Sequence, residues 1–198
     1  HIHDLDFYTL TTTCCQIDIL KLFKDGFSTG HGVLREPTAI SSYSALACIA
    51  IQSNQNDQHG GQSIVNFDYG LAPGVKKTYK KRYYRLLKNA LELLDSKLVD
   101  DEINCLKDTL QKEGFEPTLD DNPEYNEREK QLLVEKGFDE KEVEKVQAFT
   151  RRKAAEETDK ATYQAMEAFI HNLNTMHSRA GAQTPFSSIN YGMDTSTE

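Results

Sequence analysis

Apolar residues recur every third or fourth position through most of the second half of the chain, which is the spacing of an amphipathic helix. The pattern predicts four helices, over residues 75–98, 100–113, 122–135 and 139–178. Asn122-Pro123 supplies an N-cap and a first-turn proline for the third helix. Glycines follow three of the four helices, as is common where a helix ends: Gly114, Gly137 and Gly181.

The first part of the chain follows another pattern. Threonine and apolar residues alternate roughly over residues 9–19, which predicts a strand, and a glycine-bearing loop follows to about Pro37. Residues 41–55 are apolar nearly all round, so they predict a helix that is buried or lies at a subunit interface. Residues 52–63 are rich in amides and glycines and predict a loop with recognition potential. Residues 185–192 alternate like a second strand. Two strands make no stable sheet alone, so this order predicts part of a larger α/β unit.

Composition narrows the class of protein. The 198 residues are enough for one sizeable domain, and no apolar run is long enough for a membrane span. A formal net charge of −8 argues against nucleic acid as a partner, because phosphate binding needs a basic face. The four cysteines form no C-x-x-C pair and two are neighbours, which favours a reducing cytoplasm. The chain begins in mid-motif without methionine or a targeting segment, so we expect a piece of something longer.

The densest chemistry lies in the first sixteen residues. His1 and His3 would point to one face of an extended chain, and Cys14 and Cys15 to opposite faces, so at most one thiol could share a pocket with the imidazoles. Three interpretations stay open for this cluster: a metal site, which two histidines do not complete; residues hydrogen-bonded at a strand end; and a catalytic or substrate-binding role.

Other candidate residues have plainer explanations. Cys48 lies in the apolar helix and is expected to be structural, and Cys105 lies on a charged helix and is expected to be incidental. The basic cluster over residues 76–88 could hold phosphates or simply be a solvated helix end. His171 and His177 fit polar surface or interface positions better than ligands.

Several separated motifs together resemble one family, the anaerobic (class III) ribonucleoside-triphosphate reductases. The resemblance runs from end to end of the chain and covers only the N-terminal part of the family's catalytic region. It is carried by His1-Ile2-His3-Asp4-Leu5-Asp6-Phe7, the thiol pair with Asp18, Gly26-Phe27, Gln58-His59-Gly60-Gly61-Gln62, Leu71-Ala72-Pro73 and Ser187-Ser188-Ile189-Asn190-Tyr191-Gly192.

The resemblance implies an α/β fold, a mostly helical fragment of the ten-stranded barrel shared by glycyl-radical enzymes and ribonucleotide reductases. Residues 1–198 would form a single partial domain, with a helical connection at about 75–178. The strand over residues 9–19 would be the first barrel strand, and residues 187–191 would start the second. The implied activity is the conversion of ribonucleoside triphosphates to deoxyribonucleoside triphosphates by glycyl and thiyl radical chemistry.

The resemblance also implies roles for single residues. Cys14, with Cys15 as the second choice, matches the thiol that donates a hydrogen atom to the ribose, a step that suits the easily released S–H hydrogen. His1 falls where the family has an active-site histidine. Ser187, Ser188 and Asn190 would contact the substrate.

Regulation and partners follow from the same resemblance. Family members are homodimers that bind dNTP or ATP effectors between subunits, and Gln52 and Gln58 are the candidate effector contacts here. The sequence departs from relatives at Arg35-Glu36-Pro37-Thr38, where a lysine is expected after the proline. The full-length protein would add a glycyl radical, formate as reductant, a structural zinc and an activase that uses an iron-sulfur cluster and S-adenosylmethionine. The fragment alone is expected to be inactive.

Three alternatives compete with this interpretation. One is another glycyl-radical enzyme, similar to formate acetyltransferase. The second is a nonenzymatic helical dimerisation module that binds nucleotides, and the third is a His/Cys metal protein.

Overall fold

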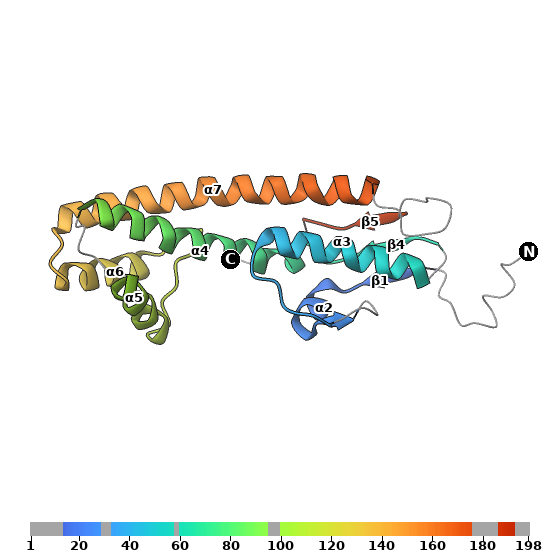
Figure 1. Cartoon of the computed structure of the whole chain (residues 1–198), viewed down its shortest axis with the longest axis horizontal. Coiled ribbons are helices and arrows are strands. Elements are labelled where there is room, and N and C mark those ends of the chain that lie inside the picture. The colour runs from blue at the N-terminus through green and yellow to red at the C-terminus, as the bar shows by residue number, and fades with distance from the viewer. Residues whose placement is uncertain (1–13, 29–32, 58–59, 95–99, 176–185, 193–198) are drawn as a thin grey trace, which may run out of the picture. The chain divides into compact units, whose positions relative to one another are not determined.

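The computed structural model describes residues 14–28, 33–57, 60–94, 100–175 and 186–192 (Figure 1). Contacts divide the chain into two compact units. The first, which we call the sheet unit, comprises His1–Gly74 and Thr162–Thr197. The second, the helical unit, comprises Val75–Ala161 together with Glu198.

Three short parallel strands form the centre of the sheet unit. They are β1 (Cys15–Ile17), β4 (Gln62–Ile64) and β5 (Ser187–Ile189), in the order β1-β4-β5. In register, Cys15 pairs with Gln62, and Gln62 pairs with Ser187. The strand predicted near residues 185–192 is confirmed as β5, and its place as the start of the second barrel strand stays a prediction. Strand β4, which lies between β1 and β5, was not predicted, and its first two residues fall at the end of the loop predicted over residues 52–63.

A short helix follows β1 directly. The strand predicted over residues 9–19 reduces to β1 among the described residues, and residues 9–13 lie outside them. Helix α2 (Ile19–Asp25) begins at Asp18, whose carboxylate accepts a hydrogen bond from the backbone N–H of Lys21 at 3.3 Å. Its buried residues Ile19 and Phe23 are one helical turn apart, so the loop predicted here is partly wrong. Beyond it, β2 (Phe27–Ser28) and β3 (Val33–Leu34) pair antiparallel.

Helix α3 (Ile40–Asp57) confirms the apolar helix predicted at residues 41–55 and continues two residues further. It contacts the sheet through Asn54, and it contacts helix α7 (Glu140–Thr175) through Ser44, whose hydroxyl donates to the Ala165 carbonyl at 2.8 Å. The amides at 52–55 therefore belong to a helix and not to a loop. Amides fit this end of the helix because Asn54 donates hydrogen bonds to side chains of the sheet.

Helix α4 (Phe67–Leu94) begins eight residues before the predicted helix and contains Pro73. Its first turns approach the rest of the sheet unit closely. A Cβ at Gly70 would collide with the Ile19 side chain, and one at Gly74 would lie 2.7 Å from Tyr43 Cδ2. In the sequence, proline and glycine at these positions suggest the end of a helix. The segment is nevertheless helical, and the side chains of Ile19 and Tyr43 pack directly against its glycine backbone.

The helical unit confirms the other predicted helices. They are α5 (Asp100–Lys112), α6 (Pro123–Glu135) and α7, with Asn122 capping α6 by accepting from the Tyr125 N–H at 3.1 Å. Gly114 and Gly137 have φ of 84° and 100°, which suits glycine at a helix end. The buried core of this unit is drawn from all four helices and includes Tyr79, Tyr83, Leu87, Leu91, Leu106, Leu110, Tyr125, Leu133 and Val143.

One carboxyl group is buried inside this core. Glu129 is fully buried, and it accepts hydrogen bonds from the hydroxyls of Tyr83 and Tyr125, both at 2.7 Å, and from Gln147 Nε2 at 2.8 Å. Burial raises the pKa of Glu129, and the three donors oppose that rise. Charged residues on the outside form ion pairs, such as Arg128 with Glu113 at 2.7 Å.

Within the described ranges, none of the helices has the length and apolar character that crossing a bilayer requires.

Candidate functional site

The central sheet of the sheet unit has two unlike faces. One face packs on α3: Ile17 and Ile64 are buried, and Asn54 Nδ2 donates to Cys15 Sγ at 2.8 Å and to Gln62 Oε1 at 2.7 Å. Side chains alternate along a strand, so the neighbours of these residues lie on the opposite face. That face, which we call the open face, carries Gln16, Ser63 and Ser188, and of these Gln16 and Ser188 are exposed. Extending the alternation by one residue before β1 assigns the exposed Cys14 to the same face.

The two adjacent thiols are in different surroundings. Cys15 is half-buried on the α3 side, where the Asn54 amide holds its sulfur. Cys14 is exposed and lies one residue before β1. The backbone joins this point to β4, because the Cys15 N–H donates to the Gly61 carbonyl at 3.2 Å. The sequence prediction that only one thiol can serve a shared pocket agrees with this separation.

The predicted substrate residues of the β5 segment also differ in their exposure. Ser188 and Asn190 are exposed, whereas Ser187 is half-buried, and its Oγ has no hydrogen-bond partner among the described residues. Ser187 pairs in register with Gln62, which faces α3. Ser188 therefore shares the open face with Cys14, and Ser187 lies on the other side.

A polar contact joins the carboxyl ends of β1 and β4. Asn66 Nδ2 donates to Asp18 Oδ1 at 2.9 Å, and this bond, with the N–H of Lys21, holds the pKa of Asp18 below its ordinary value. At the same end of the sheet, the backbone N–H of Asn190 donates a hydrogen bond to the Ile64 carbonyl at 2.9 Å. Sequence analysis did not single out Asn66, because a lone amide carries no motif, and it included Asn54 only as one member of the amide-rich stretch over residues 52–63.

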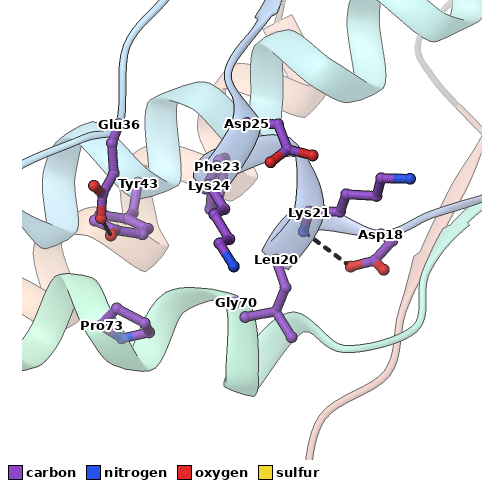
Figure 2. A pocket seen from close by; sticks show the side chains of 10 residues that line it. All are labelled: Asp18, Leu20, Lys21, Phe23, Lys24, Asp25, Glu36, Tyr43, Gly70 and Pro73. Carbon is purple, nitrogen blue, oxygen red and sulfur yellow. Dashed lines mark hydrogen bonds between the residues drawn. The ribbon is translucent and has the colours of Figure 1, made fainter.

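A separate hollow of about 480 Å³ lies between α2, the start of α3 and the first turns of α4 (Figure 2). Lys24 extends into it, while Lys21 points away, and the Tyr43 hydroxyl donates to Glu36 at 3.5 Å across one wall. None of the four open-face residues lines this hollow. It is therefore distinct from the face that carries Cys14.

The remaining sequence candidates do not gather at the open face. Gln52 lies inside α3, is 8% exposed, and its Nε2 has no partner among the described residues. Cys48 is buried, and burial raises the pKa of its thiol to about 11, as expected for a structural cysteine. Cys105 is exposed on α5. His1, His3, Gln58 and His177 lie outside the described residues.

Among the residues that the structure describes, no three His, Cys, Asp or Glu side chains gather closely enough to hold a metal ion. The His1-His3 pair proposed as a metal site is outside that part of the chain.

Comparison with known proteins identifies the family. The chain is similar to proteins named anaerobic ribonucleoside-triphosphate reductase from Enterobacteria phage T4, with 23% identity over 98% of the chain, and from Salmonella typhimurium, with 23% over all of it. The corresponding protein of Escherichia coli is 24% identical over the whole chain. The chain spans 23%, 20% and 20% of these relatives' lengths. The family described as anaerobic ribonucleoside-triphosphate reductase matches residues 1–198. With this match over its full length, the chain belongs to the anaerobic ribonucleoside-triphosphate reductase family.

Proposed function

We propose that the parent protein reduces ribonucleoside triphosphates to deoxyribonucleoside triphosphates, and that this chain forms part of its ten-stranded catalytic barrel. Membership of the family supports the reaction class. The observation that carries the assignment within this chain is the separation of the two thiols. Cys14 is exposed on the open face, whereas Asn54 holds Cys15 toward α3. In an α/β barrel the helices cover the outside, so the face away from α3 would be the inner one.

Cys14 is the hydrogen donor in this proposal. Its S–H gives one hydrogen atom to a carbon radical of the ribose, which leaves the sulfur as a thiyl radical. The net reaction replaces the ribose C2′ hydroxyl with hydrogen. Formate would supply the two electrons and the hydrogen that restores the Cys14 thiol, and it is oxidised to carbon dioxide. The C2′ hydroxyl takes up a proton from solvent and leaves as water. The glycyl radical of the parent protein would supply the first unpaired electron.

The open face offers polar groups for the sugar. Ser188 is exposed there and Asn190 is exposed just after β5, and both are the proposed substrate contacts. His1 is the proposed active-site histidine. Ser187 lies on the α3 side, so it would act by supporting β5 rather than by touching the ribose. Reduction at C2′ needs a face with hydroxyl and amide partners for the ribose oxygens, which these side chains provide.

Control by nucleotides belongs to the same proposal. The parent would be a cytoplasmic homodimer that binds dNTP or ATP effectors and is activated by an iron-sulfur, S-adenosylmethionine-dependent partner, with a structural zinc elsewhere in the full-length protein. Gln58 is the proposed effector contact. Gln52 is buried in α3, so in this proposal it would affect effector binding indirectly, by setting the position of that helix.

The test uses the full-length parent with its activase, formate and a ribonucleoside triphosphate. Cys14→Ala should abolish deoxynucleotide formation while the glycyl radical signal in electron paramagnetic resonance is unchanged, because radical generation does not need this thiol. Cys15→Ala, the matched control, should retain turnover. Turnover by the Cys14→Ala protein, or its loss only in the Cys15→Ala protein, would contradict the assignment.

A further inference from the structure

Phe186, the residue immediately before β5, exposes a large aromatic side chain from a fixed backbone. Its carbonyl accepts a hydrogen bond from the Gln62 N–H at 3.1 Å, so its main chain is held by β4. Its side chain is nevertheless 81% exposed. Most of the apolar surface of the ring is therefore left exposed.

The ring lies against a glycine on the neighbouring strand. A Cβ built at Gly61 would be 3.1 Å from Cδ1 and 3.3 Å from Cε1 of Phe186, which is tighter than an ordinary van der Waals contact. A side chain at position 61 would require the ring to shift by a few tenths of an ångström, so glycine lets it lie closest to the backbone here. The Gly61 carbonyl in turn accepts from the Cys15 N–H at 3.2 Å. The ring therefore lies against the residue before β4 whose carbonyl is bonded to the backbone of Cys15.

Strand alternation places this ring on the open face. Gln62, the residue after Gly61, contacts Asn54 on the α3 side, so position 61 faces the other way. Along the β5 segment, Phe186 and Ser188 are exposed and Ser187 is half-buried, which gives the same alternation. Gln16, Ser63 and Ser188 pair in register as one row on this face. Extending the same register to the residues just before the strands assigns Cys14, Gly61 and Phe186 to the neighbouring row.

We propose that Phe186 is a substrate-binding residue whose ring supports the ribose of the ribonucleoside triphosphate beside Cys14, with Gly61 as the position that admits the ring. The inference rests on the proposed function and extends it. An aromatic face packs well against the C–H bonds of a sugar and excludes water from the contact. Hydrogen-atom transfer from a thiol requires the carbon to be held against the sulfur, so a rigid apolar support next to Cys14 would align the sugar.

The experiment compares variants of the full-length parent, assayed with its activase, formate and a ribonucleoside triphosphate. Phe186→Leu should lower kcat/KM by about tenfold, mainly through KM, because lost contact weakens substrate binding by roughly 1.4 kcal/mol. Equilibrium dialysis of the same triphosphate with the unactivated protein should show a matching loss of affinity. Phe186→Tyr should retain both values near those of the unchanged protein, since it keeps the ring.

Two further variants separate a role in binding from a role in folding. Gly61→Ala should displace the ring and lower kcat/KM in the same direction as Phe186→Leu. Phe149→Leu removes a 43% exposed ring on α7 in the helical unit and should leave binding and turnover unchanged. Glycyl radical yield and melting temperature should stay constant across the set.

The outcomes distinguish this inference from the proposed function. If the unchanged parent makes deoxynucleotides but Phe186→Leu binds and turns over like Phe149→Leu, the inference about Phe186 is wrong and the function stands. If Phe186→Leu mainly lowers the melting temperature or the radical yield, the ring is a packing residue and the inference is again wrong. If the unchanged parent, carrying its radical, makes no deoxynucleotide, the proposed function itself fails.

Discussion

The two units of the chain treat polar side chains in opposite ways. In the helical unit, the Glu129 carboxyl is fully buried, and each of its oxygens accepts at least one hydrogen bond from a tyrosine or glutamine. In the sheet unit, Gln16 and Ser188 stand exposed on a face of the sheet that no described helix covers. The carboxyl of Glu129 has its hydrogen bonds made inside the core, whereas Gln16 and Ser188 are available to another molecule.

This difference separates stability from binding. A buried polar group whose bonds are all made fixes the packing around it and has no capacity left for a ligand. A polar row on an exposed sheet face contributes little to folding and can recognise another molecule. We therefore interpret the Glu129 cluster of the helical unit as structural, and the proposed site lies on the open face of the sheet unit.

The largest expected effect comes from breaking the satisfied cluster. Glu129→Leu should lower the free energy of unfolding by about 3 kcal/mol, because the buried hydroxyls of Tyr83 and Tyr125 lose their acceptor. Urea unfolding of the purified protein measures this change. Glu129→Gln, which keeps the shape and one acceptor oxygen, is the control and should cost clearly less. If the leucine variant were as stable as the unchanged protein, the Glu129 cluster would not stabilise the helical unit, and the contrast between the two units would be wrong.

A smaller effect should appear in the dependence of stability on pH. Burial raises the pKa of Glu129 in the folded protein above its ordinary value of 4.5, with hydrogen bonds from Gln147, Tyr125 and Tyr83 opposing the rise. The favourable contribution is then fully present below pH 4.5 and is lost as the pH rises through the folded-state pKa. Melting temperatures from pH 4.5 to 8 should fall relative to those of Glu129→Gln. If the difference in melting temperature between the two proteins were the same at every pH, the pKa of Glu129 would be the same in the folded and unfolded states.

The smallest effect is expected at the boundary between the two sheet faces. Asn54→Ala removes the amide that donates to Cys15 and Gln62, and should cost about 1 kcal/mol. Cys15 should then react faster with iodoacetamide, as followed by peptide mass spectrometry, while the rate at Cys14 stays constant. Gln16→Ala, on the open face, should change the rate at Cys15 little. If Asn54→Ala left the Cys15 rate unchanged, the amide would not be what shields that thiol.

Local chemistry explains why the helical unit was predictable. The N-cap of α6 was expected from Asn122-Pro123, and the structure confirms it with the bond to the Tyr125 N–H. Gly114 and Gly137 end helices where the apolar spacing stops. These features depend on residues within one or two turns, which a sequence displays directly.

Non-local pairing explains what was missed in the sheet unit. Strand β4 consists of Gln62, Ser63 and Ile64, a segment too short and too polar to show a strand pattern, and it exists because β1 and β5 pair with its two edges. The start of α4 was missed for a similar reason, since Pro73 and Gly74 favour a break unless Tyr43 packs against the glycine. The family resemblance supplied Cys14. The structure adds that Ser187 and Ser188 face opposite sides, which the sequence motif alone had grouped together.

The position of β4 between β1 and β5 also has a consequence for biosynthesis. Ile64 cannot pair with Ile189 until the ribosome has made every residue of α4 to α7. The helical unit is continuous in sequence and can fold first, whereas the sheet unit is discontinuous and has to wait for its last strand. During that interval one edge of β4 has no partner, and such an edge can join strands from neighbouring nascent chains. Translation stalled before Phe186 would therefore leave a helical product with an aggregation-prone end.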